Sequence, residues 1–298
     1  MATLRSQVSS SRRMTEGSSA PKSRRQFTRR MFAAHLGVAG GLLMLPASTA
    51  GGKKLKEEHL ISGLRLRTGQ PLSRMKQFYS DKLGLEIVEE SEQLLTLATG
   101  ASQLSFEYTE GSQARYHFAF NIPENQVLAA HRWQRERSEL IEPPARLVDE
   151  GMPREVVAFR HWNAHSVFFH DPARNVVEYI ARHDLDNADN SEFSAANSAL
   201  CISEIGLVTE DVPALARSLA TSLELETYVS SSEAFHPLGD QQGLILVMKR
   251  GGAMAFGKDC CRDIFPTQVQ LNRNQMQPID IKGHPYRLAG SDVDVPNR

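Results

Sequence analysis

The chain has 298 residues, of which 41% are hydrophobic and 23% are charged, with a formal net charge of −1 at pH 7. Residues 1–50 contain eight of the 34 basic residues and one of the 35 acidic residues, so residues 51–298 carry a formal net charge of −8. Because an acidic chain repels nucleic acid and anionic lipid, neither is expected as a partner. The three cysteines, Cys201, Cys260 and Cys261, lack the paired spacing of a disulfide framework or a cysteine metal site.

Residues 1–50 have the pattern of an export leader. Arg24 and Arg25 stand in a basic start, the apolar run Met31–Leu45 follows, and the small residues Ala47–Ala50 end the segment. The apolar run is shorter than the roughly twenty residues of a membrane-spanning helix, so we expect cleavage after Ala50 and no stable membrane anchor. The segment resembles a twin-arginine signal, which exports folded proteins. We therefore expect a periplasmic or extracellular location.

The segment that follows predicts one helix among several strands. Alternating apolar residues from Ile61 predict a strand, and apolar residues at helical spacing predict a helix over Leu72–Leu83 that ends at Gly84. Three further strands are predicted, at Leu85–Val88, Leu94–Thr99 and Gln103–Tyr108. This order of elements defines a first βαβββ unit over residues 55–110.

A second unit is predicted over residues 114–184. It opens with the alternating strand Tyr116–Phe120, and a helix is expected over Val127–Leu140. Two strands, Ser166–Phe169 and Val176–Ile180, flank a turn at Asp171–Asn175.

The first unit is repeated after residue 200. Ile202–Leu207 matches Ile61–Leu66, and Leu223–Glu226 matches Leu83–Glu86, at offsets of 141 and 140. We therefore predict an α+β fold in which paired βαβββ modules form curved sheets around a cavity, with three module-like units. Because one unit is too small to bury a core alone, units one and two are expected to pair as a domain over 55–184.

The third unit has no obvious partner within the chain. It follows a polar linker at residues 185–199 and occupies 200–298 as a partial unit. It could pack against the first pair of units, or against a second copy of the chain in a homodimer.

Three motifs together resemble the vicinal oxygen chelate superfamily: Phe78–Leu85, Tyr116–Phe120 and Ser166–Glu178. The superfamily includes glyoxalase I, extradiol ring-cleaving dioxygenases and bleomycin-resistance proteins, and the resemblance covers about residues 58–290. It implies a cavity between paired modules and one divalent metal ion at its base. It also implies a small-molecule substrate or ligand.

The resemblance implies that His117 and Glu178 are metal ligands in the second unit. Imidazole nitrogen and carboxylate oxygen suit Fe, Mn, Ni or Zn as divalent ions. The corresponding position of the first unit is Gly63, which offers no ligand atom. His165 and, in the third unit, Glu204 are the candidates for a third ligand.

These residues also have structural interpretations. His117 could be a hydrogen-bonded core histidine, although a buried Glu178 would still need a partner or a metal ion. The candidates for contacts to a bound ligand are Trp162, Asn163, Phe169 and Tyr179.

Three functions therefore remain open from the sequence. The first is an exported metal-dependent enzyme, dioxygenase- or glyoxalase-like, that acts on a small oxygen-bearing substrate. The second is a metal-free binding protein of the bleomycin-resistance type. The third is an obligate dimer whose purpose is assembly.

Overall fold

The structure is a computed structural model that describes residues 60–253 and 262–291. Residues Met1–Lys53 and Lys54–Arg298 are separate units, and all described residues lie in the second unit. The candidate leader, Cys260 and Cys261 lie outside the described residues. Within the described part of the chain, no helix has the length and apolar character needed to cross a membrane.

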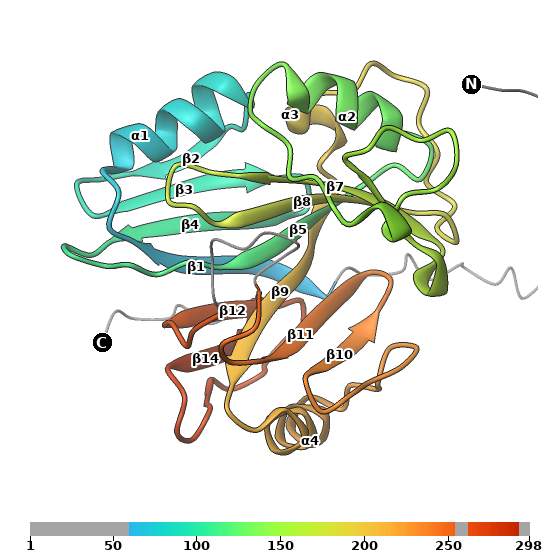
Figure 1. The fold of residues 1–298 in the computed structure, drawn as a ribbon. Helices are drawn as coiled ribbons and strands as arrows, with labels where there is room; N and C mark the ends of the chain where they lie inside the picture. Colours follow the sequence, from blue (N-terminus) through green and yellow to red (C-terminus); the bar gives the residue numbers. More distant parts are fainter. Residues whose placement is uncertain (1–59, 254–261, 292–298) are drawn as a thin grey trace, which may run out of the picture. The chain divides into compact units, whose positions relative to one another are not determined.

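The elements follow the order expected from the sequence (Figure 1). The first unit consists of β1 (Ile61–Thr68), α1 (Leu72–Lys76), a π-helical turn η1 (Gln77–Lys82), β2 (Ile87–Glu90), β3 (Leu94–Thr99) and β4 (Ser102–Tyr108). The second consists of β5 (His117–Ile122), α2 (Val127–Arg135), η2 (Ala145–Leu147), β6 (Val156–Phe159), η3 (Arg160–Trp162), β7 (Ala164–His170) and β8 (Val176–Arg182). Helix α2 is shorter than predicted: it ends at Arg135, and the amides of Arg137 and Ser138 close one last turn on the carbonyl of Gln134.

The rest of the chain contains two further units. After α3 (Ala195–Ser198) come β9 (Cys201–Thr209), α4 (Val212–Leu223), β10 (Phe235–Asp240) and β11 (Gly243–Lys249). The last unit is β12 (Thr267–Leu271), β13 (Ile279–Asp280) and β14 (Tyr286–Gly290), with no helix between these strands. In each unit the first strand pairs in parallel with the last, as in β5 with β8 and β9 with β11. The predicted α+β fold of βαβββ modules is confirmed, with a fourth, helix-free unit that the sequence did not reveal.

The pairing between units differs from the expectation. Strand β5 pairs antiparallel with β9, and β1 pairs antiparallel with β12. The first strands of units one and two are therefore not paired with each other, since each takes its antiparallel partner from the later half of the chain. Similar units offer similar strand edges, so local sequence patterns do not specify which edges meet. The predicted domain limits and the homodimer stay predictions, although the third unit has its strand partner within the chain.

The two faces of the strands carry different side chains. Along β8, Val177, Tyr179 and Ala181 belong to the large hydrophobic core, which also includes Phe78 and Tyr79 of the first unit. The alternate residues, Glu178 and Arg182 among them, point to the opposite face. This alternation separates the core of the protein from the face that carries the candidate site.

A buried hydrogen bond joins two of the sequence motifs. The hydroxyl of Tyr79 donates to Oδ2 of Asp171 at 2.8 Å, although the residues are 92 positions apart. Asp171 also accepts from the backbone and side-chain amides of Asn175, at 2.9 and 2.7 Å. Burial nevertheless raises the pKa of Asp171 to about 6. The helical turn of unit one is thereby tied to the Asp-Pro turn of unit two.

We predict that Tyr79→Phe lowers the free energy of unfolding by about 1–3 kcal/mol, because it leaves a buried carboxylate without one of its donors. Urea denaturation would measure the change. Tyr108→Phe is the matched control, since Tyr108 is 37% exposed and its loss should cost less than about 0.5 kcal/mol. Equal stabilities of the two variants would contradict the importance of this bond.

Candidate metal centre

His117 is the first residue of β5 and is 6% exposed. Its Nδ1 lies 3.2 Å from the carbonyl oxygen of Val176, so the N–H on Nδ1 donates to that oxygen. The ring also stacks against Phe168, with centroids 5.9 Å apart. The lone pair of Nε2 is therefore free to face the two carboxylates described next.

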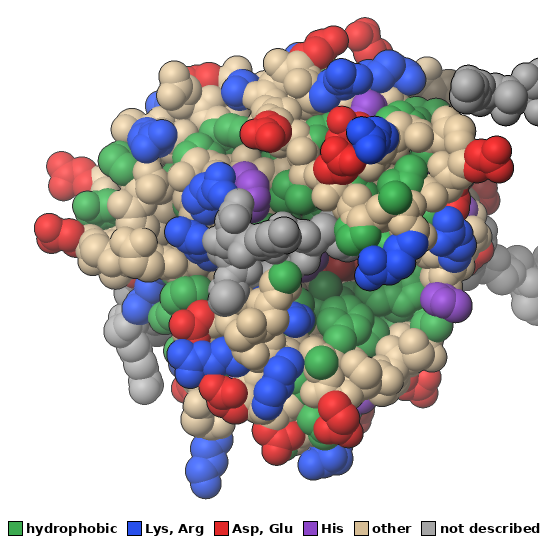
Figure 2. Space-filling model, in the orientation of Figure 1, with side chains coloured by type: hydrophobic (Ala, Val, Ile, Leu, Met, Phe, Trp, Pro, Cys, Tyr) green, Lys and Arg blue, Asp and Glu red, His purple; other side chains and the backbone are tan. Residues whose placement is uncertain are grey.

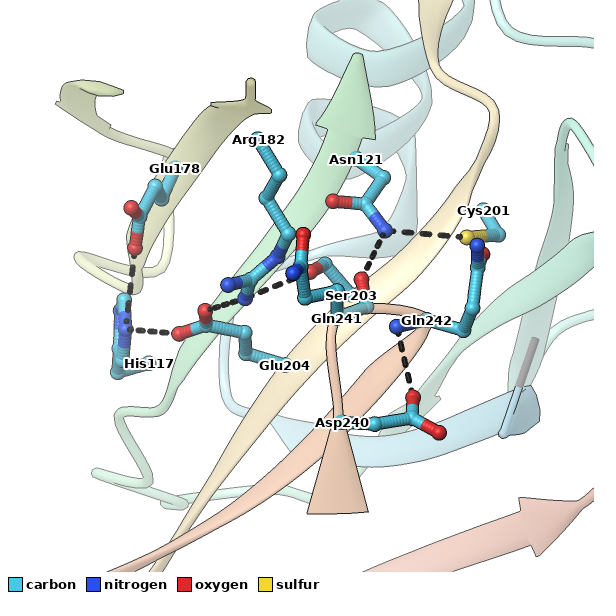
Figure 3. Close-up of polar contacts among 10 residues, drawn as sticks. All are labelled: His117, Asn121, Glu178, Arg182, Cys201, Ser203, Glu204, Asp240, Gln241 and Gln242. Carbon is cyan, nitrogen blue, oxygen red and sulfur yellow. Dashed lines mark hydrogen bonds and ion pairs between the residues drawn. The ribbon is translucent and has the colours of Figure 1, made fainter. Parts of the chain in front are cut away.

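The strand register brings Glu178 and Glu204 to His117. Ala119 of β5 is paired with Glu178 of β8 on one side and with Glu204 of β9 on the other. Nε2 of His117, two residues away on the same face, lies 3.4 Å from Oε2 of Glu178 and 3.9 Å from Oε2 of Glu204 (Figure 3).

Burial dominates the ionisation of this cluster. It lowers the pKa of His117 to about 4, so the imidazole is neutral near pH 7. It raises the pKa of Glu178 well above its usual range, and the charge of Glu204 raises it further. Burial also raises the pKa of Glu204, against the opposing charge of Arg182. A lone pair facing two carboxylates requires a proton or a cation between them.

Arg182 supplies part of that positive charge. Its Nη2 donates to Oε1 of Glu204 and, at 3.3 Å, to Oγ of Ser203 (Figure 3). Its side chain is fully buried. The sequence interpretation missed this residue, although it stands four positions after Glu178 in the same strand and therefore on the same face.

The geometry fits a divalent ion. One ligand atom from each of His117, Glu178 and Glu204 lies within 4.8 Å of the other two. Two atoms that each lie about 2.1 Å from an ion are separated by roughly 3.0 Å at a right angle and by at most about 4.2 Å. The distances of 3.4 and 3.9 Å from Nε2 of His117 to the two glutamates lie within this range. Oε1 of Glu178 is buried without a hydrogen-bond partner among the described residues. One imidazole and two carboxylates suit Mn, Fe or Zn.

The third unit does not supply a fourth ligand. In the second unit, Glu178 is paired across the sheet with Ala119, which lies two positions after His117. In the third unit, the residue that lies two positions after Glu204 is Gly206. Gly206 is paired with Leu246 of β11, whose side chain is apolar. Any further coordination positions would therefore remain for water or a substrate.

Gly63 is explained by its neighbour on β12. A Cβ atom at Gly63 would lie 2.5 Å from Oε1 of Gln270, which is paired with Gly63 across the sheet. The side chain of Gln270 thus fills the space that a ligand at position 63 would need. Glu204, the equivalent position in the third unit, reaches the cluster instead.

His165 does not join the cluster. It lies on the other face of β7 from Phe168, because successive residues of a strand alternate. Its Nδ1 lies 2.7 Å from Nε2 of His183, and its Nε2 lies 3.0 Å from Oδ2 of Asp149. The prediction of His165 as a third ligand is therefore corrected in favour of Glu204.

Three of the four residues that were predicted to contact a bound ligand lie away from the cluster. Phe169 and Tyr179 are fully buried in the large core. Each follows Phe168 or Glu178 directly in its strand and therefore points to the opposite face of the sheet. Asn163 is an exposed turn residue with φ 45°, and its amide donates to Asp184 at 2.7 Å. Of the four, Trp162 alone lies on the side of the cluster.

An aromatic wall flanks the cluster. Trp162 contacts Tyr228 and Phe235 of the third unit, with ring centroids 5.3 and 6.2 Å apart, and Phe159 at 5.6 Å. Figure 2 shows hydrophobic side chains gathered over β10 and β11, where the surface is hollowed. We name Phe159, Trp162, Tyr228 and Phe235 the aromatic wall. The sequence offered no local signal for Tyr228 and Phe235, which come close only through the β5–β9 pairing.

Comparison with known proteins supports the fold. No protein-family model and no curated protein matches the sequence. A Bacillus subtilis protein whose assignment as a dioxygenase is provisional is 12% identical, with a TM-score of 0.52 over 79% of this chain and 86% of that chain. Glyoxalase I from Zea mays is 14% identical, with a TM-score of 0.46 over 77% and 91%. At 12% identity the likeness to the Bacillus subtilis protein establishes the fold alone.

We predict a pH-dependent stability that originates at Glu178. In the metal-free protein, the raised pKa of Glu178 means that the folded state favours the protonated carboxyl group. The contribution of this group to the free energy of unfolding is therefore complete below about pH 4.5 and is lost as the pH rises. Glu178→Gln cannot ionise, so the free energy of unfolding of the wild type relative to this variant should fall between pH 5 and 8. Urea denaturation of both proteins in the presence of a chelator would measure these free energies of unfolding. Parallel curves would contradict the assignment.

Proposed function

We propose that this protein is an exported, divalent-metal-dependent enzyme, dioxygenase- or glyoxalase-like, that acts on a small oxygen-bearing substrate. The supporting observation is the convergence of His117, Glu178 and Glu204 from three adjacent strands on one buried point. Two buried carboxylates beside a neutral imidazole are costly unless a cation balances them. The fold shared with a provisionally assigned dioxygenase is consistent with this proposal.

A bound ion would act as a Lewis acid and as a template that orients neighbouring oxygen atoms of a substrate. The residues of the chain prepare the site for it. The bond from His117 to Val176 fixes the imidazole tautomer, and Arg182 holds one oxygen of Glu204 so that the other faces His117. Phe168 covers one side of the imidazole and limits the access of water.

The aromatic wall offers the route by which a small molecule would approach. A hollow of about 270 Å³ adjoins it, lined by Leu147, Phe159, Trp162 and Ser230 among others. Ligand sites of small molecules are mostly apolar clefts with a few polar groups. The hollow has this character, since apolar and aromatic side chains line it together with a few polar ones, although His117, Glu178 and Glu204 do not.

A metal-free binding protein is the second candidate. The observation in its favour is the ion pair of Arg182 with Glu204, which already balances one of the two carboxylates. A proton shared by Glu178 and His117 would balance the other. In that case the aromatic wall would bind a planar ligand without a metal ion.

Metal analysis distinguishes the two candidates. We predict about one equivalent of divalent metal in the wild type, and a loss of affinity of at least about 100-fold in His117→Ala, since outer contacts alone are worth 10–100-fold. His165→Ala is the matched control and should keep its affinity within about threefold. Fewer than about 0.1 equivalents after saturation with Fe, Mn, Ni and Zn would refute the metal centre.

Export has its own test. Replacing both Arg24 and Arg25 with lysine should leave the protein inside the cytoplasm of a bacterial host with a twin-arginine translocase, because that route reads the arginine pair. Fractionation and immunoblotting would measure the distribution. Arg12→Lys with Arg13→Lys, an arginine pair outside the motif, is the control. Unchanged export of the Arg24/Arg25 variant would contradict this route.

A further inference from the structure

Units one and four form a second polar surface that repeats the layout of the candidate metal centre. Arg65 of β1 has the place that Ala119 has in β5, since it is paired with Ser105 of β4 on one side and with Gln268 of β12 on the other. Ala119 is paired in the same way with the two glutamates of the metal centre. Gly63, two residues before Arg65, has the place of the histidine. We name the surface that carries Arg65, Ser105 and Gln268 the second face; it has an arginine where the first has metal-binding groups around an alanine.

The second face is hollowed beside its arginines. A hollow of about 350 Å³ lies along β1, β12 and β14. The charged residues that line it are three arginines and two acidic residues: Arg65, Arg67, Arg287, Glu107 and Asp280. Their formal net charge is +1, whereas residues 51–298 together carry a net charge of −8. A positively charged hollow on an acidic chain concentrates the local field on small anions.

Arg287 has an unused donor at this hollow. Its Nη1 donates to both carboxylate oxygens of Asp280, at 2.9 and 3.1 Å, which fixes the guanidinium group. Its Nε is buried without a hydrogen-bond partner among the described residues. Arg287 and Arg65 lie on either side of Gln268 on the same face, because each is paired with it in a neighbouring strand. An unmade hydrogen bond of a charged donor is costly, so an oxyanion bound at these two arginines would relieve that cost.

A smaller hollow of about 200 Å³ continues the larger one, because Arg65 and Gln268 line both. Its polar lining consists of three amide and two hydroxyl side chains: Gln103, Gln268, Gln270, Thr96 and Ser105. The acidic residue of this lining, Glu89, is exposed. Amide groups both donate and accept hydrogen bonds, as the hydroxyl groups of a ligand do. The smaller hollow therefore suits a neutral, hydroxyl-rich group.

We propose that the second face binds a small molecule that joins an oxyanion to a hydroxyl-rich body, as a sugar phosphate or a sugar acid does. The arginines would hold the phosphate or carboxylate group, whose paired oxygens match the forked donors of arginine. The amides of the smaller hollow would bind the sugar hydroxyls. This site contains no residue of the candidate metal centre, so it is a second binding function that does not depend on the first.

Four probes test the site: glucose 6-phosphate, glucuronate, glucose and inorganic phosphate. They are titrated calorimetrically into the full-length protein after its metal has been removed and the chelator dialysed away, so that the metal centre does not contribute. We expect at least one of the two sugar anions to bind about tenfold more tightly than glucose and at least about threefold more tightly than inorganic phosphate. The sugar anion that binds more tightly identifies the anionic group as a phosphate or a carboxylate.

Three variants localise the binding. Arg67→Gln should weaken the preferred sugar anion at least about fivefold, because Arg67 lines the larger hollow. Arg217→Gln is the matched control, since it removes the same charge from the exposed side of α4 and should change the affinity less than about twofold. Gln103→Ala should remove the advantage over inorganic phosphate and leave the binding of phosphate itself unchanged, because Gln103 lines only the smaller hollow.

Two results with the wild type alone overturn the site: no detectable binding of either sugar anion at millimolar concentration, or equal affinities for the sugar anions and glucose. An advantage over glucose but not over inorganic phosphate overturns the hydroxyl-rich ligand. Equal losses in Arg67→Gln and Arg217→Gln overturn the site as well, because the attraction would then come from overall charge. Since the protein is metal-free throughout, none of these results bears on the candidate metal centre, which metal analysis tests separately.

Discussion

The antiparallel pairing of β5 with β9 is the contact on which the candidate site depends. It places Glu204 beside Ala119, whose other neighbour across the sheet is Glu178, and so assembles three ligand atoms around His117. A slip of one residue in this register would turn Glu204 toward the core and bring Ser203 or Ile205 to the cluster. The same pairing brings Tyr228 and Phe235 to Trp162, so the cluster and the aromatic wall have one structural origin.

Charge balance connects this geometry to function. The site buries two carboxylates with a single guanidinium group, and a buried charge without a partner costs several kcal/mol. Arg182 partners Glu204, whereas the nearest charged or titratable partner of Glu178 is a neutral imidazole. With both glutamates ionised, the cluster is thus one positive charge short of neutrality, and either a proton on Glu178 or a bound cation balances it.

Several features could be predicted from particular residues, and others could not. The motifs around Tyr79 and Asp171 identified the fold, and the structure joins them by a buried hydrogen bond. The strand register also shows why Phe169 and Tyr179 were wrong choices as ligand contacts, since Phe168 is the residue paired with Glu178. Had the alternation along β7 and β8 been followed from Glu178, Phe168 and Arg182 would have been found. Gln270, which fills the space over Gly63, had no local signal at all.

The amino-acid sequence by itself determined the βαβββ units, because alternating and helical periodicities act over a few residues and need no distant partner. It also determined which residues could act as ligands, since His117, Glu178 and Glu204 were recognisable by type and position in their units. Only the tertiary structure decided that Glu204 rather than His165 completes the cluster and that Arg182 lies against it. The reason is that local sequence patterns do not distinguish the edges of similar strands. The packing of the whole chain selects which of these edges meet.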